Sequence, residues 1–211
     1  MFYPIRTPWL LKKLYPAYTW NIPSQDRVDR VLYLSFDDGP HPDATPFALD
    51  TLKTFGAKAT FFCIGKNVDD HPELYKRLLD EGHRVGNHTQ DHLNGWKTPA
   101  GQYLENIRTA AGVIDSDLFR PPYGRITRSE AAALTALPVP YKIIMWDILS
   151  GDFDTRITGA RCVSHVIGKA RTGSIIVFHD SKKAFQRMSV ALPEILHHFC
   201  SLGYRFATIP I

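Results

Sequence analysis

Two short clusters of polar residues have the types and spacing of a metal site. Asp37 and Asp38 follow the apolar run 31–36, and His88 and His92 stand four positions apart. Residues at i and i+4 share one helical face, so both imidazoles can converge on one ion and leave room for a carboxylate as third ligand. Such a set keeps positions open for water, which the ion activates for hydrolysis, while the other aspartate serves as a base. Taken alone, the histidine pair is a weak signal, and adjacent aspartates more often cap a helix or close a turn than bind metal.

A proline-rich loop forms the second group of interest, Phe119-Arg-Pro-Pro-Tyr-Gly124. Its two prolines fix the backbone and Gly124 permits an unusual conformation, so the loop can hold Tyr123 and its backbone N–H in one place. A structural turn with a buried tyrosine is the alternative. Arg120 is more informative, because a guanidinium close to several acids can orient a carboxylate and keep it ionised.

The third group combines acids and a histidine at strand ends. His179 ends the apolar run 175–178, and the segment 145–154 carries Asp147 and Asp152. A histidine in that place is often a buried core residue with its hydrogen bonds satisfied. An acid partner such as Asp152 can instead raise its pKa and keep it protonated for donation to a leaving amine. We therefore take His179 as the candidate general acid.

These residues follow strands in a repeating strand–loop–helix pattern. The sequence predicts strands over 31–36, 59–64, 84–86, 118–119, 141–146, 174–178 and 205–209, and helices over 45–55, 72–81, 103–114, 129–137, 159–170 and 190–200. About seven strands that alternate with helices imply parallel pairing, hence an α/β barrel or an open doubly wound sheet. The barrel is favoured because nearly every polar cluster follows a strand, where such a barrel assembles its active site.

Length and composition limit the remaining possibilities. A chain of 211 residues with 44% hydrophobic and 22% charged residues fits one globular catalytic domain, which we assign to 27–211, with an arm over 1–26 packed on it. The net charge of +4 is spread along the chain, so no nucleic-acid groove is expected. Three scattered cysteines suggest buried, reduced thiols. The N-terminus lacks a secretory or membrane-spanning run, which predicts a cytoplasmic location.

Five motifs in order resemble those of the NodB-type polysaccharide deacetylases, carbohydrate esterase family 4. They are Ser35–Gly39, His88–His92, Arg120–Gly124, Trp146–Phe153 and Ile175–His179, and the resemblance spans about 31–210. It implies a distorted (β/α) barrel, one divalent metal ion, most often zinc although cobalt or another divalent ion can serve, and removal of N-acetyl groups from N-acetylglucosamine-containing chains such as peptidoglycan or chitin. The oligomeric state stays open.

The resemblance also assigns roles position by position. It implies Asp37 as the base, Arg120 as the residue that positions this base, and Asp38, His88 and His92 as metal ligands. It implies His179 as the catalytic histidine, Asp152 as the acid that tunes it, and the Tyr123 N–H as the oxyanion donor. The implied substrate-binding residues are Pro121, Pro122, Tyr123, Trp146, Ile175 and Val177, of which Ile175 and Val177 line the acetyl-methyl pocket.

The fourth motif departs from the family pattern W-x-x-D-x-x-D-W. Leu149 stands in place of its first aspartate and Phe153 in place of its last tryptophan, and Asp147 is a candidate to compensate. Two other functions therefore stay open. One is a hydrolase of the same fold that acts on a small intracellular amide or ester, which suits the missing export signal. The other is a carbohydrate-binding protein without catalytic activity.

Overall fold

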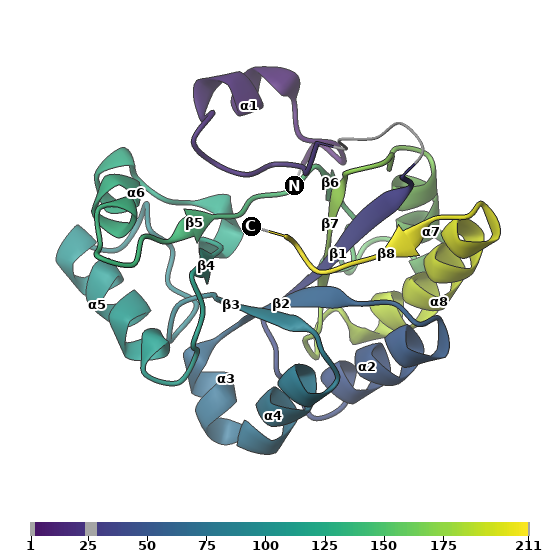
Figure 1. Ribbon diagram of the computed structural model, residues 1–211, viewed down its shortest axis with the longest axis horizontal. Helices are drawn as coiled ribbons and strands as arrows, with labels where there is room; N and C mark the ends of the chain where they lie inside the picture. The colour runs from purple at the N-terminus through teal and green to yellow at the C-terminus, as the bar shows by residue number, and fades with distance from the viewer. Residues whose placement is uncertain (1–2, 24–28, 211) are drawn as a thin grey trace.

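A curved parallel sheet forms the centre of the molecule, a computed structural model that describes residues 3–23 and 29–210 (Figure 1). The strand order is β5-β4-β3-β2-β1-β7-β6, and β8 pairs with the start of β1. The strands are β1 (Val31–Asp37), β2 (Ala59–Cys63), β3 (Arg84–Asn87), β4 (Leu118–Phe119), β5 (Lys142–Ile143), β6 (Ile148–Leu149), β7 (Ile175–His179) and β8 (Arg205–Phe206). The predicted distorted α/β barrel is confirmed. The predicted strand 141–146 was wrong in extent, since β5 ends at Ile143 and the next strand, β6, begins at Ile148 on the opposite sheet edge.

Helices surround the sheet on its outer side (Figure 1). They are α1 (Trp9–Leu14), α2 (Ala44–Thr54), α3 (Gly65–Asp70), α4 (Pro72–Asp80), α5 (Ala100–Ala111), α6 (Arg128–Thr135), α7 (Gly159–Ile167) and α8 (Phe185–Ser201), with a 3₁₀ turn η1 at Pro122–Gly124. Helix α3 was not predicted. Helix α8 begins before the predicted residue 190 and contains Pro193, a residue that usually marks a first turn. Among the described residues, no helix combines the length and apolar character needed to cross a membrane.

Strand alternation decides which side chains reach the interior of the barrel. In β1, Leu32, Leu34 and Phe36 pack outward in the core beneath the helices. Successive side chains of a strand point to opposite faces, so Tyr33, Ser35 and Asp37 point inward. In β7 the same rule places Ile176 and Phe178 in the outer core and Val177 and His179 inside. Because β1 and β7 pair in register, with Asp37 beside His179, both polar residues reach the same end of the barrel.

The N-terminal arm fills the gap between the two edge strands β5 and β6, where Figure 1 shows α1 lying across the opening. Arg6 bridges to Ile148 of β6, and Thr19 bridges to Ile144 just after β5. The arm is fastened by the buried carboxylate of Asp147, which accepts hydrogen bonds from Lys12 Nζ at 2.6 Å and Ser174 Oγ at 2.7 Å. The boundary assigned at residue 26 lies outside the described residues.

Candidate active site

Three side chains at the carboxyl ends of β1 and β3 form a candidate site for a divalent metal. One ligand atom from each of Asp38, His88 and His92 lies within 4.8 Å of the others. Asp38 Oδ1 is 3.2 Å from His92 Nε2 and 3.7 Å from His88 Nε2, and this buried oxygen has no well-aligned hydrogen bond. A buried carboxylate oxygen without a partner is costly. A cation held by this oxygen and two imidazoles would satisfy it, so the donor set fits a metal.

The two histidines converge because of loop geometry, and the predicted helical spacing was wrong. Strand β3 ends at Asn87, and the chain then turns through positive φ angles of 66° at Thr89 and 56° at His92. Asn87 Oδ1 accepts a hydrogen bond from the Thr89 N–H at 2.8 Å, which fixes the turn. The described non-glycine residues with positive φ are Asp38, Thr89, His92 and Tyr123, all in this region. Such strain is concentrated at functional sites.

His88 and Asp38 have the protonation states that metal ligands need. Burial lowers the pKa of His88 to about 4, so its imidazole is neutral. Its Nδ1 lies 2.7 Å from the Arg120 carbonyl oxygen and donates to it, which leaves Nε2 free to face Asp38. Burial opposes ionisation of Asp38, but contacts with His92, His179 and His88 lower its pKa well below the ordinary range. The carboxylate is therefore ionised.

Asp37 lies beside the metal ligands and is held by a fully buried arginine. Arg120 Nη1 donates to Asp37 Oδ1 at 2.6 Å, and the guanidinium is stacked 4.0 Å from the Phe62 ring centroid. Its other donors bind the carbonyl oxygens of Ile144 at 3.2 Å and Met145 at 3.0 Å. With its donors fixed in this way, Arg120 holds one oxygen of the Asp37 carboxylate in a defined orientation.

The proline loop presents Tyr123 at the rim of the site. Pro121 and Pro122 are buried, whereas Tyr123 is 62% exposed and adopts a φ of 60°. Its ring lies edge-on to His92 at 4.6 Å. The Tyr123 N–H donates to no other described residue, so it remains available to a ligand. A Cβ on Gly124 would lie 2.6 Å from the Trp146 ring, so glycine is required where the loop passes over Trp146.

His179 is held by both oxygens of one buried carboxylate. Asp152 Oδ1 lies 2.8 Å from His179 Nδ1, and Asp152 Oδ2 accepts from the His179 backbone N–H at 2.7 Å. Burial favours the neutral imidazole, but the charge and hydrogen bond of Asp152 prevail and raise the pKa of His179 to about 10. The structure thus brings Asp152 and His179 together, with the imidazole protonated at neutral pH.

The two departures in the fourth motif have different surroundings. Phe153 lies edge-on to the His179 ring at 5.3 Å, and Tyr3 of the arm packs against Phe153 at 4.9 Å. Leu149 pairs through its N–H with the Ile5 carbonyl at 2.8 Å. The idea that Asp147 compensates was wrong, because its carboxylate binds Lys12 and Ser174 at the far end of β7 instead of the site.

The two predicted pocket residues of β7 lie at different depths. Val177 is buried two positions before His179 and on the same inward face. Ile175 begins the strand, about 13 Å from His179 at 3.3 Å per residue, and packs with Val31 and Ile209. The structure therefore does not bring Ile175 to the metal cluster. Ile175 and His179 point to the same face of the sheet, but they lie at the two ends of the strand and so at different ends of the barrel.

Two residues support the site without having been predicted from the sequence. Ser35 Oγ accepts from Arg120 Nη1 at 2.8 Å and donates to the Ile176 carbonyl at 3.0 Å. Asp180, whose pKa burial raises to about 8, accepts from Thr45 Oγ1 at 2.5 Å. A Cβ on Gly39 would lie 2.0 Å from the Asp180 carboxyl group, so only glycine lets this carboxyl group lie against the loop that carries Asp38. The alternation of side chains along the predicted strand 31–36 could have identified Ser35 as an inward-pointing residue.

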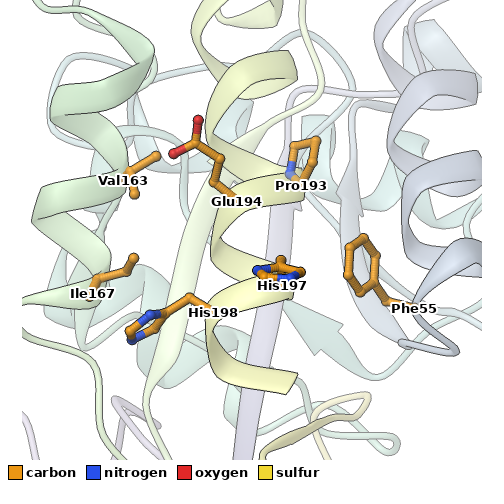
Figure 2. Close-up of a pocket in the computed structure, with 7 residues that line it drawn as sticks. All are labelled: Phe55, Val163, Ile167, Pro193, Glu194, His197 and His198. Carbon is orange, nitrogen blue, oxygen red and sulfur yellow. The ribbon is translucent and has the colours of Figure 1, made fainter. Parts of the chain in front are cut away.

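A hollow of ≈ 500 Å³ lies on the outer helical layer, away from these residues. Figure 2 shows it between Val163 and Ile167 of α7, Pro193 and His197 of α8, and Phe55. It contains none of the predicted site residues. The chemistry is therefore concentrated at the carboxyl ends of the strands, as the barrel predicts.

Comparison with known proteins places this geometry in context. A family model described as polysaccharide deacetylase matches residues 24–141. The chain is 35% identical to a peptidoglycan-N-acetylglucosamine deacetylase of Bacillus cereus, over 95% of each chain. It is also 35% identical to the peptidoglycan-N-acetylglucosamine deacetylase PgdA of Listeria monocytogenes, over 87% of this chain but 39% of that protein. The crystal structure of the Bc1960 peptidoglycan N-acetylglucosamine deacetylase, bound to a hydroxamate-type benzamide, superposes with a TM-score of 0.86 at 30% identity, over 97% of this chain and 95% of that one.

Proposed function

The chain belongs to the polysaccharide deacetylase family, NodB-type carbohydrate esterase family 4, and from this premise we propose that it hydrolyses the acetamide of N-acetylglucosamine units in peptidoglycan- or chitin-type chains. The products are acetate and a free amino sugar. One observation carries the proposal: the Asp38, His88 and His92 cluster lies next to a held carboxylate, Asp37, and a protonated histidine, His179.

We propose zinc as the ion, because a set of two imidazoles and one carboxylate suits zinc and leaves coordination positions open. Asp38, His88 and His92 would hold it. When bound, such an ion polarises a carbonyl oxygen and acidifies water, which is the chemistry that amide hydrolysis needs at neutral pH. Cobalt or another divalent ion could replace it with the same donor set.

The residues around this site divide the remaining work. Asp37, oriented by Arg120, accepts the proton of the attacking water molecule. The free Tyr123 N–H donates to the oxyanion that develops from the acetyl carbonyl. His179, kept protonated by Asp152, gives its proton to the departing sugar nitrogen.

The competing functions make different predictions about activity. A hydrolase of a small intracellular amide or ester would release acetate from monomers or nucleotide sugars faster than from oligomers. A silent binding protein would release none, yet every position of the catalytic set is filled by a residue able to act. The cytoplasmic location stays a prediction. For the substrate we propose a carbohydrate chain and not a nucleic acid.

The test is acetate release from N-acetylglucosamine oligomers, with an Asp37→Asn variant measured beside the wild type. We expect the variant to lose at least about 10²-fold in kcat, the contribution of a positioned base, and to retain its bound metal by elemental analysis. Asp43→Asn, an exposed aspartate of the same loop region, is the matched control and should keep full activity. Chelation should abolish acetate release and added zinc or cobalt restore it. Full activity of Asp37→Asn would contradict the assignment of the base.

A further inference from the structure

A second aromatic residue beside the site has no role in the reaction described so far. Among the described residues, the tryptophan, tyrosine and phenylalanine side chains that are largely exposed are Trp9 at 67%, Trp96 at 59% and Tyr123 at 62%. Tyr123 lies at the candidate metal site. Trp96 follows the ligand His92 by four residues, in the loop between β3 and α5. A single exposed ring is common on protein surfaces, so what distinguishes Trp96 from Trp9 is its place in the loop that carries the ligand His92.

The Trp96 ring is held in place although it is exposed. Its indole Nε1 donates to the Ile126 carbonyl at 3.0 Å, and the Arg125 guanidinium carbon lies 4.4 Å from the ring centroid. Its backbone N–H donates to Asn94 Oδ1 at 3.0 Å. With the indole N–H bonded and Arg125 stacked on the ring, the exposed part of Trp96 is largely apolar ring surface whose rotamer is fixed. A fixed ring loses little conformational entropy on binding.

The loop that carries Trp96 packs against the loop that carries Tyr123, and this contact limits the distance between Trp96 and the site. A Cβ on Gly95 would lie 2.6 Å from the Arg125 carbonyl oxygen, so the two backbones are in direct contact there. Ile126, which accepts the indole hydrogen bond, is three residues from Tyr123. Three residues span at most about 10 Å. The residue that anchors the indole is therefore at most about 10 Å from Tyr123, so Trp96 is within reach of sugars next to the one that reacts.

We propose that Trp96 is a subsite for a neighbouring sugar of the substrate chain, which stacks the apolar C–H face of its pyranose ring on the indole. This rests on the proposed function and deepens it, because it makes the enzyme specific for chains over single sugars. Stacking on an aromatic ring is available to any pyranose, since every such ring has an apolar face. The anchor is held rigidly, and tryptophan is enriched among the residues that dominate binding energy. The amide being hydrolysed does not touch Trp96, so the residue is predicted to act on binding alone.

The experiment compares Trp96→Ala, Trp96→Phe and Trp9→Ala with the wild type, using N-acetylglucosamine and its oligomers. Trp9 is the matched control, since it is also largely exposed and also has a cation over its ring, Lys13 at 4.9 Å, but lies on α1. We expect Trp96→Ala to raise KM for long oligomers about tenfold, the loss typical of an aromatic anchor, with kcat and the monomer reaction unchanged. Trp96→Phe, which keeps a ring but not the indole N–H, should recover most of the affinity, and Trp9→Ala should match the wild type.

If Trp96→Ala had the same KM as the wild type at every chain length, the proposed subsite would be refuted and the deacetylase assignment would stand. A folding check by thermal unfolding accompanies each variant, and Trp96→Phe separates loss of the ring from loss of the loop hydrogen bond. A wild type that releases no acetate would instead refute the proposed function. The subsite is then judged by NMR titration with an N-acetylglucosamine tetramer: weaker binding by Trp96→Ala supports it, and equal binding or none by the wild type refutes it.

Discussion

The pairing of Asp152 with His179 makes a quantitative prediction about pH. Burial by itself lowers the pKa of His179, yet the charge and the 2.8 Å contact of Asp152, with smaller contributions from Asp38 and Asp37, raise it to about 10. The substitution Asp152→Asn removes the negative charge, so the pKa should fall to its ordinary value of about 6.5 or below. A histidine with that pKa is only about 3% protonated at pH 8. If His179 must be protonated to release the amine, kcat at pH 8 should fall about 30-fold or more.

The assay is the pH profile of kcat between about pH 6 and about pH 10.5, which includes the wild-type alkaline limb. Because the variant loses proton affinity, its alkaline limb should move to lower pH and the wild-type-to-variant ratio should shrink as the pH falls. The matched control is Asp117→Asn. Asp117 forms an ion pair with Lys142 at 2.7 Å that is remote from the site, so this variant should leave the pH profile unchanged. An equal loss of kcat at every pH, or an unmoved alkaline limb, would refute the reasoning.

The same pair predicts a stability effect of defined sign. The pKa of His179 is higher in the folded protein than in the unfolded chain, so the stabilisation from Asp152 is fully present below about pH 6.5 and is lost as the pH rises through about 10. The difference in unfolding free energy between the wild type and Asp152→Asn should follow this course. Urea unfolding at several pH values measures it.

Two further predictions concern buried charges. Arg120→Met leaves the Asp37 carboxylate buried without its cation, so the free energy of unfolding in urea should fall by about 3–5 kcal/mol; an unchanged unfolding midpoint would contradict the contact at 2.6 Å. Lys12→Met removes the ammonium 2.6 Å from Asp147, so unfolding should become easier by about 1–3 kcal/mol and the arm should be cleaved faster in limited proteolysis. Burial opposes ionisation of Asp147, but Lys12 and Ser174 lower its pKa, so this difference should disappear as the pH falls below about 4. A difference that persists in acid would contradict the ion pair.

Much of the site could be predicted because the chemistry lies at strand ends. The apolar run that ends at Asp37 and the run that ends at His179 each fix a buried strand, and parallel strands bring their carboxyl ends to one edge. The motif order then placed Asp38, His88, His92, Arg120 and Asp152 near one another, and the structure brings them together. Local sequence carried this information because Asp38, His88 and Arg120 directly follow β1, β3 and β4.

Other features depended on contacts distant in sequence. The convergence of His88 and His92 arises from positive φ angles in a loop, which their spacing of four did not reveal. Asp147 follows a strand like the other acids, but its partner Lys12 comes from an arm that fills the gap between β5 and β6. The side chain of Ile175 points to the same inward face of the sheet as His179, but it lies at the other end of the barrel.

The sequence by itself determined the class of chemistry, since residue types and their position after strands define a metal site, a base and an acid. Only the tertiary structure decided how each group is tuned. Arg120 is charged wherever it lies, but its hold on Asp37 requires the carbonyl oxygens of Ile144 and Met145 from another segment. The pKa of His179 and the exposure of Trp96 likewise follow from which distant residues surround them, because desolvation and Coulomb interactions depend on distance in space and not along the chain.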